Sequence, residues 1–223
     1  MDIQTLMAST VHDVKNSLGF IESQLTTVVR RIDGQDPASA EELRRIQLEC
    51  ARINNGMVHM LGLYRMQAGQ FVPDFDEVLV TDVVEYALSR HTPVLNALGI
   101  EVTVTEEGFD GLWYMDSNLV EGILSNVVTN SIRYTHSKLH FLVREVDGWL
   151  NISIQDDGEG FPDKMIHMLD QPETLCFHSG ATGLGLYFCQ QIAQMHTNGE
   201  RKGYVQLSNR EDSKGAIFDL WLP

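Results

Sequence analysis

Apolar residues in the first 64 positions recur at alternating spacings of four and three, which is the heptad pattern of helical bundles and coiled coils. The first run consists of Met7, Val11, Val14, Leu18, Ile21, Leu25, Val28 and Ile32. The second consists of Leu43, Ile46, Cys50, Ile53, Met57, Met60 and Tyr64. Between them, residues 34–37 (Gly-Gln-Asp-Pro) supply a stop and a turn. The sequence therefore predicts a helix over residues 3–32 and a second seamed helix, joined as an antiparallel hairpin.

Two helices cannot enclose a core well, so the apolar seams of the hairpin need a further partner. We expect a second copy of the chain to cover them, in a homodimeric four-helix bundle with an isologous interface. The alternative is that the hairpin packs on the C-terminal part of its own chain. The helical periodicity lapses around residues 68–73. The predicted domains are therefore 1–70, the hairpin, and 71–223.

Overall composition excludes several classes of protein. The net charge of −15 over 223 residues argues against nucleic-acid binding, which needs a basic face. No apolar run approaches the roughly 18–20 residues of a membrane span. The three cysteines, Cys50, Cys176 and Cys189, have no metal-ligand spacing and are expected to be small apolar residues. These features predict a soluble protein of the cytoplasm with no membrane span.

Helical and strand patterns alternate after residue 73. Helices are expected over 81–97 with Thr81 as N-cap, from Asp116-Ser117 through about Tyr134, and over 184–197. Strands are expected over 100–105, 112–115, 138–146, 149–155, 203–210 and 215–222. Asp147-Gly148 is a dipeptide that closes hairpins. The fold class predicted is α+β: the helical hairpin, followed by a sandwich with helices on one face of a mostly antiparallel sheet.

The first candidate site lies on the first helix, just outside its apolar seam. His12 lies between Val11 and Val14, Asp13 follows it, and Asn16 lies one turn later on the same face as His12. This flank position keeps the histidine open to solvent and partners. A helical histidine by itself is most often an ordinary surface or core residue, and a phosphate acceptor is the alternative.

The second candidate site lies late in the helix that starts at Asp116-Ser117. Asn126 and Asn130 are four residues apart, with Arg133 and Tyr134 following. Amide oxygens suit Mg²⁺, a guanidinium suits phosphate, and an aromatic ring can cover a purine. The alternative is a helix with ordinary surface amides.

Two glycine-containing segments complete the set. Asp156, Gly158 and Gly160 follow a strand, where an acidic side chain could read an adenine amino group; an acidic turn or a calcium loop are the alternatives. Gly183-Leu184-Gly185 opens a helix, where backbone N–H groups can reach phosphates.

The order and spacing of these segments resemble a known family. Asn126/Asn130, Asp156-x-Gly158-x-Gly160 and Gly183-Leu184-Gly185-Leu186 resemble the N, G1 and G2 boxes of the Bergerat-type ATPase fold, shared by sensor histidine kinases, gyrase, Hsp90 and MutL. His12-Asp13-Val14-Lys15-Asn16 resembles the H box of the histidine kinases alone. The resemblance covers essentially the whole chain. It implies a dimerisation and phosphotransfer hairpin followed by a catalytic ATP-binding domain.

The resemblance also implies a role for each matched residue. His12 would attack the γ-phosphate of ATP, Asp13 would orient its ring, and Asn16 would serve phosphatase activity. Asn130 and Asn126 would hold Mg²⁺, with Arg133 screening the phosphates. Asp156 would read adenine beside Tyr134, and the residues giving backbone room and phosphate contacts would be Gly158, Gly160, Gly183, Leu184 and Gly185. The phosphoryl group would pass to an aspartate of a response-regulator receiver domain.

Three features depart from the family pattern. Ser17 stands where proline is common after the histidine, and Ala181 stands where the G2 box often has its first glycine. The usual aromatic-Pro-Phe element is absent between Phe161 and Gly183, in a lid containing Met165, Met168, Pro172 and Phe177. Only eleven residues precede His12, so we expect either a cut-down chain or a stand-alone kinase that receives its signal from a separate sensor protein.

Three functions are compatible with this pattern. The first is an ATP-dependent protein-histidine kinase. The second is a histidine phosphotransfer or scaffold module with a decayed ATP site. The third, a Bergerat-fold ATPase without histidine transfer, is disfavoured by the H box and the small size.

Overall fold

The computed structural model describes residues 3–108, 111–167, 183–210 and 214–223, without the side chains of residues 3–8, 12 and 48. The chain divides into two compact units, Met1–Phe71 and Val72–Pro223. The predicted lid residues Met168, Pro172 and Phe177, together with Cys176 and Ala181, lie outside the described residues.

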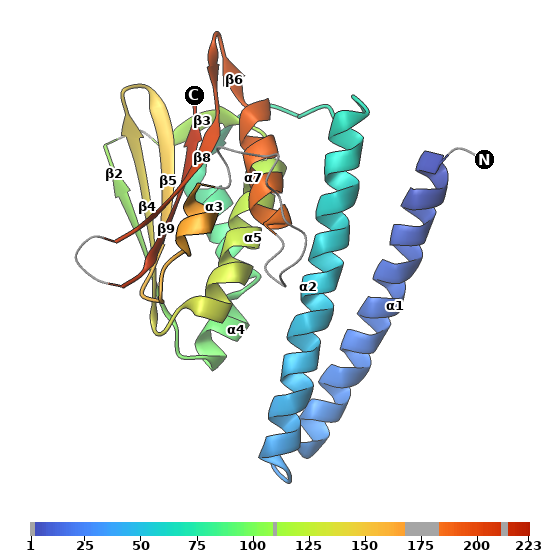
Figure 1. Cartoon of the computed structure of the whole chain (residues 1–223). Helices are drawn as coiled ribbons and strands as arrows, with labels where there is room; N and C mark the ends of the chain where they lie inside the picture. The colour runs from blue at the N-terminus through green and yellow to red at the C-terminus, as the bar shows by residue number, and fades with distance from the viewer. Residues whose placement is uncertain (1–2, 109–110, 168–182, 211–213) are drawn as a thin grey trace. The chain divides into compact units, whose positions relative to one another are not determined.

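The first unit is a helical hairpin of α1 (Ile3–Ile32) and α2 (Pro37–Gln67) (Figure 1). The predicted helix over residues 3–32 is confirmed, and α1 runs through Ser17 without a break. The hydroxyl of Ser17 donates to the carbonyl oxygen of Asp13 at 2.9 Å, within the helix. The second helix extends beyond its seam at both ends.

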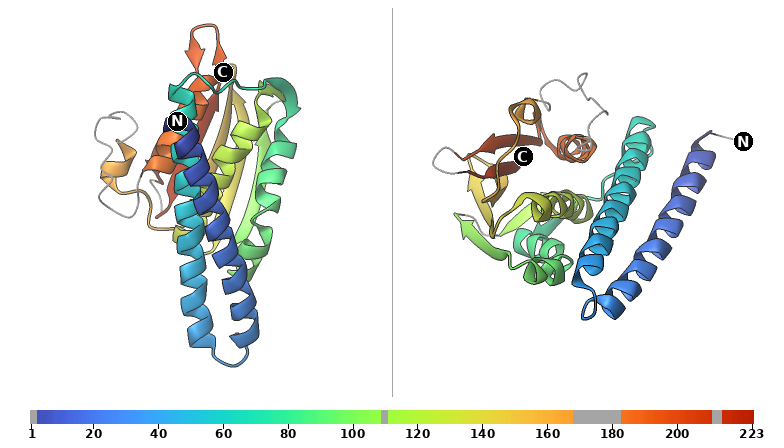
Figure 2. Two further views of the ribbon diagram at one scale, coloured as in Figure 1. Left: turned by 90° about the vertical axis from the view of Figure 1, so that its right-hand side faces the viewer. Right: turned by 60° about the horizontal axis from the view of Figure 1, so that its bottom comes forward.

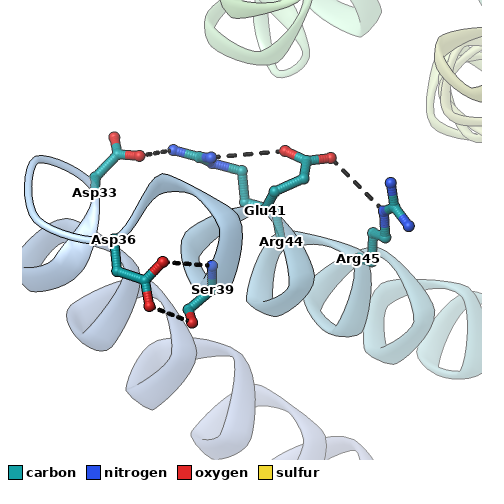
Figure 3. Close-up of polar contacts among 6 residues, drawn as sticks. All are labelled: Asp33, Asp36, Ser39, Glu41, Arg44 and Arg45. Carbon is teal, nitrogen blue, oxygen red and sulfur yellow. Dashed lines mark hydrogen bonds and ion pairs between the residues drawn. The ribbon is translucent and has the colours of Figure 1, made fainter.

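The turn between the two helices is stabilised by local polar contacts (Figure 3). Asp36 is the N-cap of α2, and its carboxylate accepts hydrogen bonds from the backbone N–H and the hydroxyl of Ser39, at 3.1 and 2.5 Å. Pro37 follows at the first helical position, where its missing N–H costs nothing. Arg44 pairs with Asp33 across the turn. Because these groups are exposed, their contacts add little to the stability of the fold. Their main effect is to define where α2 begins.

The second unit is built on a five-stranded sheet in the order β2-β4-β5-β9-β8. Its strands are β2 (Glu101–Glu107), β4 (Lys138–Val146), β5 (Trp149–Asp156), β8 (Tyr204–Asn209) and β9 (Ala216–Leu222). The pair β2–β4 is parallel, and the other pairs are antiparallel. The helices α3 (Val80–Ser89), α5 (Ser117–Tyr134) and α7 (Leu184–Met195) cover one face of the sheet (Figures 1 and 2). This arrangement confirms the predicted α+β class.

Smaller elements complete the unit. The strand β1 (Asp76–Leu79) pairs antiparallel with β3 (Leu112–Met115), and β6 (Thr197–Asn198) pairs with β7 (Arg201–Lys202). The short helices are α4 (Thr92–Ala97) and α6 (Asp163–Ile166). Within the described residues, no helix is both long and apolar enough to cross a membrane.

The core of this unit lies between the sheet and its covering helices. Alternate residues of each central strand point inward, as a period of two requires. The fully buried side chains include Phe141, Ile152, Phe218 and Leu220 from the sheet, and Ile123 and Leu124 from α5. The core therefore holds α5 against β5, the two elements that carry half of the predicted nucleotide residues.

Local sequence signals explain several of the boundaries. Asp116 is the N-cap of α5, where its side chain accepts a hydrogen bond from the N–H of Leu119 at 3.0 Å, as predicted. Asp147 and Gly148 both have positive φ, +52° and +72°, so they form the type I′ turn expected of an Asp-Gly hairpin.

The prediction of one helix over residues 81–97 was wrong. The structure has two helices, α3 and α4, which are separated at Arg90–His91. Pro93 lacks the N–H needed to continue the hydrogen bonding of α3, but it is well accommodated in the first turn of a new helix.

The predicted N-cap of that helix was also wrong. Thr81 does not cap α3, which begins one residue earlier, and its hydroxyl donates to Glu106 at 2.7 Å. The strand β1 was not predicted, because residues 76–79 form a strand only through their pairing with β3.

Candidate functional site

Helix α5 places the predicted metal and phosphate residues in two different environments. Asn126 is buried, and its amide nitrogen donates to the sulfur of Cys189 on α7, 3.3 Å away. Asn130, Arg133 and Tyr134, in the last two turns, are exposed. The two asparagines share a side of the helix, but only Asn130 presents its amide to solvent.

The contact between α5 and α7 depends on a glycine. A Cβ atom at Gly185 would lie 3.0 Å from both polar atoms of the Asn126 amide, closer than an ordinary contact. Gly183, the N-cap position of α7, has a left-handed φ of +56°, which favours glycine. Burial raises the pKa of Cys189 to about 12, so this thiol stays neutral and packs as a small apolar residue.

Asp156 ends β5 and is buried, with one carboxylate oxygen committed to the backbone. Its Oδ1 accepts hydrogen bonds from the N–H of Gly158 at 2.9 Å and of Ala216 at 3.1 Å. Within the part of the chain that the structure describes, no hydrogen bond reaches Oδ2. One oxygen therefore orients the side chain, and the second can accept a hydrogen bond from a ligand.

The glycines after Asp156 allow the backbone of their loop to pack closely against the end of α5 and against Asn209. A Cβ atom at Gly158 would lie 2.2 Å from the carbonyl oxygen of Tyr134, so this position has no room for a side chain. Gly160 has a φ of +88°, and a Cβ there would meet the Asn209 side chain at 2.7 Å. The loop therefore lies directly against the end of α5.

Asn209 is a site residue that the sequence did not reveal. Its amide oxygen accepts from the N–H of Phe161 at 2.6 Å, and its amide nitrogen donates to the carbonyl oxygen of Phe161 at 2.8 Å. This pair of bonds ties the glycine loop to β8. Only the pairing of β8 with β9 brings Asn209 there, and no local pattern indicates it.

The three predicted nucleotide segments thus meet around the C-terminal half of α5. Gly158 contacts Tyr134, and Gly185 contacts Asn126. The fourth segment lies in the other unit, where Asp13 and Asn16 are exposed on α1 and the side chain of His12 is not described. Among the described residues, no cluster of three or more His, Cys, Asp or Glu side chains could hold a metal ion.

Comparisons with known proteins agree with this geometry. Residues 115–223 match the family model of histidine kinase-, DNA gyrase B-, and HSP90-like ATPases. Over 236 residues the chain is 28% identical to the sensor histidine kinase CpxA of Escherichia coli strain K12, covering 99% of this chain and 47% of that protein. The chain is therefore similar to sensor histidine kinases over nearly its whole length. It is also 25% identical to the sensor histidine kinase CssS of Bacillus subtilis, with 99% of this chain and 46% of that protein covered.

Solved structures of histidine kinases share the fold. The Acinetobacter baumannii histidine kinase AdeS is 21% identical, with 95% of this chain and 96% of that chain covered and a TM-score of 0.61. Full-length ShkA in complex with AMPPNP is 17% identical, with 98% and 45% covered and a TM-score of 0.67. The chain spans about half the length of the curated relatives it matches.

Proposed function

We propose that this chain is an ATP-dependent protein-histidine kinase, which phosphorylates His12 and passes the phosphoryl group to an aspartate of a response-regulator receiver domain. The observation that carries the proposal is the convergence of Asp156, Gly158 and Gly185 on the C-terminal half of α5. A convergence of this kind would form a nucleotide site, as the similarity of residues 115–223 to histidine kinase-, DNA gyrase B-, and HSP90-like ATPases supports.

Asp156 and Tyr134 would bind the adenine end of ATP. The adenine amino group would donate to the second oxygen of Asp156, since the first already accepts two backbone hydrogen bonds. The exposed ring of Tyr134 can pack against the base. Gly158 and Gly160 have no side chain, so the loop after Asp156 can lie against Tyr134 and Asn209, which would hold Asp156 in position toward the base.

Asn130 is the residue that fits Mg²⁺ best. It offers an exposed amide oxygen, a hard donor of the kind that Mg²⁺ accepts beside waters and phosphate oxygens. Arg133, three residues later, can screen the phosphate charge. The amide of Asn126 is buried against α7, so we assign it chiefly to positioning Gly183, Leu184 and Gly185, whose backbone would contact the phosphates. A bound Mg²⁺ would neutralise charge on the phosphates.

The hairpin would supply the phosphate acceptor. A ring nitrogen of His12 would form a bond to the γ-phosphorus as the bond to the β–γ bridging oxygen breaks, which releases ADP. Asp13 would accept a hydrogen bond from the other ring nitrogen and so orient the imidazole. Asn16, one turn later, would position a water that hydrolyses the phosphoaspartate of the regulator, which gives a phosphatase activity.

The exposed seam supports a homodimer. Among the seam residues whose side chains the structure describes, five are at least 40% exposed: Ile21, Val28, Ile46, Ile53 and Met60. These positions repeat along both helices, so they form apolar stripes that a second hairpin can bury. We propose that a second copy covers them in a four-helix bundle.

Asn130→Ala is expected to weaken Mg-ATP binding by about tenfold or more, since even indirect metal contacts contribute that much. Calorimetric titration of the full chain, with Mg²⁺ and with a chelator, measures the effect. The variant should differ from the unsubstituted chain only when Mg²⁺ is present. Asn118→Ala, an exposed amide at the opposite end of α5, is the matched control and should bind normally. If the unsubstituted chain binds no ATP at millimolar concentration, the result favours the alternative, a histidine phosphotransfer or scaffold module with a decayed ATP site.

A further inference from the structure

The Asp157 side chain accepts several hydrogen bonds from the segment that joins α5 to β4. Asp157 Oδ1 accepts hydrogen bonds from the N–H groups of His136 and Ser137, both at 2.9 Å. Its Oδ2 accepts from the hydroxyl of Ser137 at 2.7 Å. The ring nitrogen Nδ1 of His136 lies 2.8 Å from the carbonyl oxygen of Asp157. Burial alone would raise the pKa of Asp157, but the hydrogen bonds from Ser137, Lys138 and His136 hold it well below its usual range.

Asp157 lies at the junction between the adenine end and the metal end of the proposed ATP site. Asp157 directly follows Asp156, the residue proposed to bind adenine. The segment it holds directly follows Tyr134 and the two turns of α5 that carry Asn130 and Arg133. The register of β4 and β5 ends at the pair Leu139–Asp156, so Asp157 continues the connection beyond the sheet. The close approach of Gly158 to the Tyr134 carbonyl is the second contact at this junction.

We infer that Asp157 is a positioning residue, which holds the end of α5 at a set distance from Asp156 and thereby aligns the metal end of the site with the adenine end. This inference rests on the proposed function and names a residue that would not itself touch the nucleotide. Removing the Asp157 carboxylate leaves each half of the site intact but lets the two halves move relative to one another. A ligand that must contact both halves then loses affinity, whereas ligands that contact one half do not.

The test compares three ligands on the full chain carrying Asp157→Ala. Mg-ATP affinity, measured by calorimetry, should fall by about tenfold or more, because several hydrogen bonds to a charged group are removed. Mg-tripolyphosphate, measured by NMR titration, should bind within about twofold of the unsubstituted chain, because it would not contact Asp156. Adenosine should lose less affinity than Mg-ATP, because only its packing on Tyr134 depends on the position of α5. Asp157→Asn keeps an amide oxygen for the two backbone donors, so its effect should be intermediate. Ser137→Ala removes a single hydrogen bond and should act in the same direction, more weakly.

Asp147→Asn is the matched control, at the opposite end of the β4–β5 hairpin, where asparagine tolerates the positive φ of +52°. It should bind all three ligands normally. Normal Mg-ATP binding by Asp157→Ala would overturn the inference and leave the proposed function standing. An equal loss of adenosine and Mg-ATP would also overturn it, since Asp157 would then act on the adenine end alone. An unsubstituted chain that binds no Mg-ATP would overturn the proposed function, and this inference with it.

Discussion

Gly158→Ala is expected to abolish measurable ATP binding. The added methyl group would lie 2.2 Å from the carbonyl oxygen of Tyr134, so the loop or the end of α5 must move. That movement separates Asp156 from the residues of α5 that would hold the phosphates and metal. Forcing a side chain into such a contact also destabilises the fold, typically by about 1–3 kcal/mol. Calorimetric titration with Mg-ATP and thermal denaturation measure the two effects.

Gly122→Ala is the matched control for this substitution. Gly122 lies in α5, and a Cβ atom there meets nothing within 4 Å. Alanine is a better helix former than glycine, so this variant should be more stable by about 0.5–1 kcal/mol and should bind ATP normally. If Gly158→Ala also binds ATP normally, the loop after Asp156 does not form part of a nucleotide site.

Asp156→Asn is expected to weaken ATP binding by about 10- to 100-fold, with little loss of stability. The amide oxygen can keep the hydrogen bonds from Gly158 and Ala216, which occupy one carboxylate oxygen in the structure. The amide nitrogen then replaces the second oxygen, and its N–H groups face the adenine amino group, another donor. Calorimetric titration gives the affinity.

A comparison of GTP with ATP distinguishes the loss of a contact with the base from a general disruption of the site. Guanine presents a carbonyl oxygen where adenine presents an amino group, so Asp156→Asn should lose much of its preference for ATP over GTP. Asp219→Asn, a change of a partly buried carboxylate on β9, should leave that preference unchanged. A variant at position 156 that still prefers ATP as strongly as the unsubstituted chain would show that Asp156 does not read the base.

The sequence predicted those elements whose signals are local. The heptad seam defined α1, Asp116 marked the start of α5, and Asp147-Gly148 marked a hairpin turn. The break between α3 and α4 was missed because the periodic pattern continues across Pro93. The strand β1 was missed because four residues with two adjacent acids carry no alternation, and pairing with β3 supplies what the local sequence lacks.

The sequence predicted which segments form the candidate site. It did not predict which of their side chains are buried or which distant residues contact them. A spacing of four predicts that Asn126 and Asn130 share a side of the helix, but the packing of Gly185 on Asn126 buries only the first. Asp157 and Asn209 were missed because their partners lie 20 or more residues away along the chain. Their roles depend on which strands and loops become neighbours.

Phosphorylation of His12 is the central claim, and labelling with γ-labelled ATP tests it most directly. The full chain should acquire label that acid removes and alkali does not, as expected of a phosphorus–nitrogen bond. His12→Gln should acquire none while still binding Mg-ATP, because the proposed nucleotide residues lie at position 126 and beyond. Label that survives the substitution of His12, or that is stable to acid, would contradict the account.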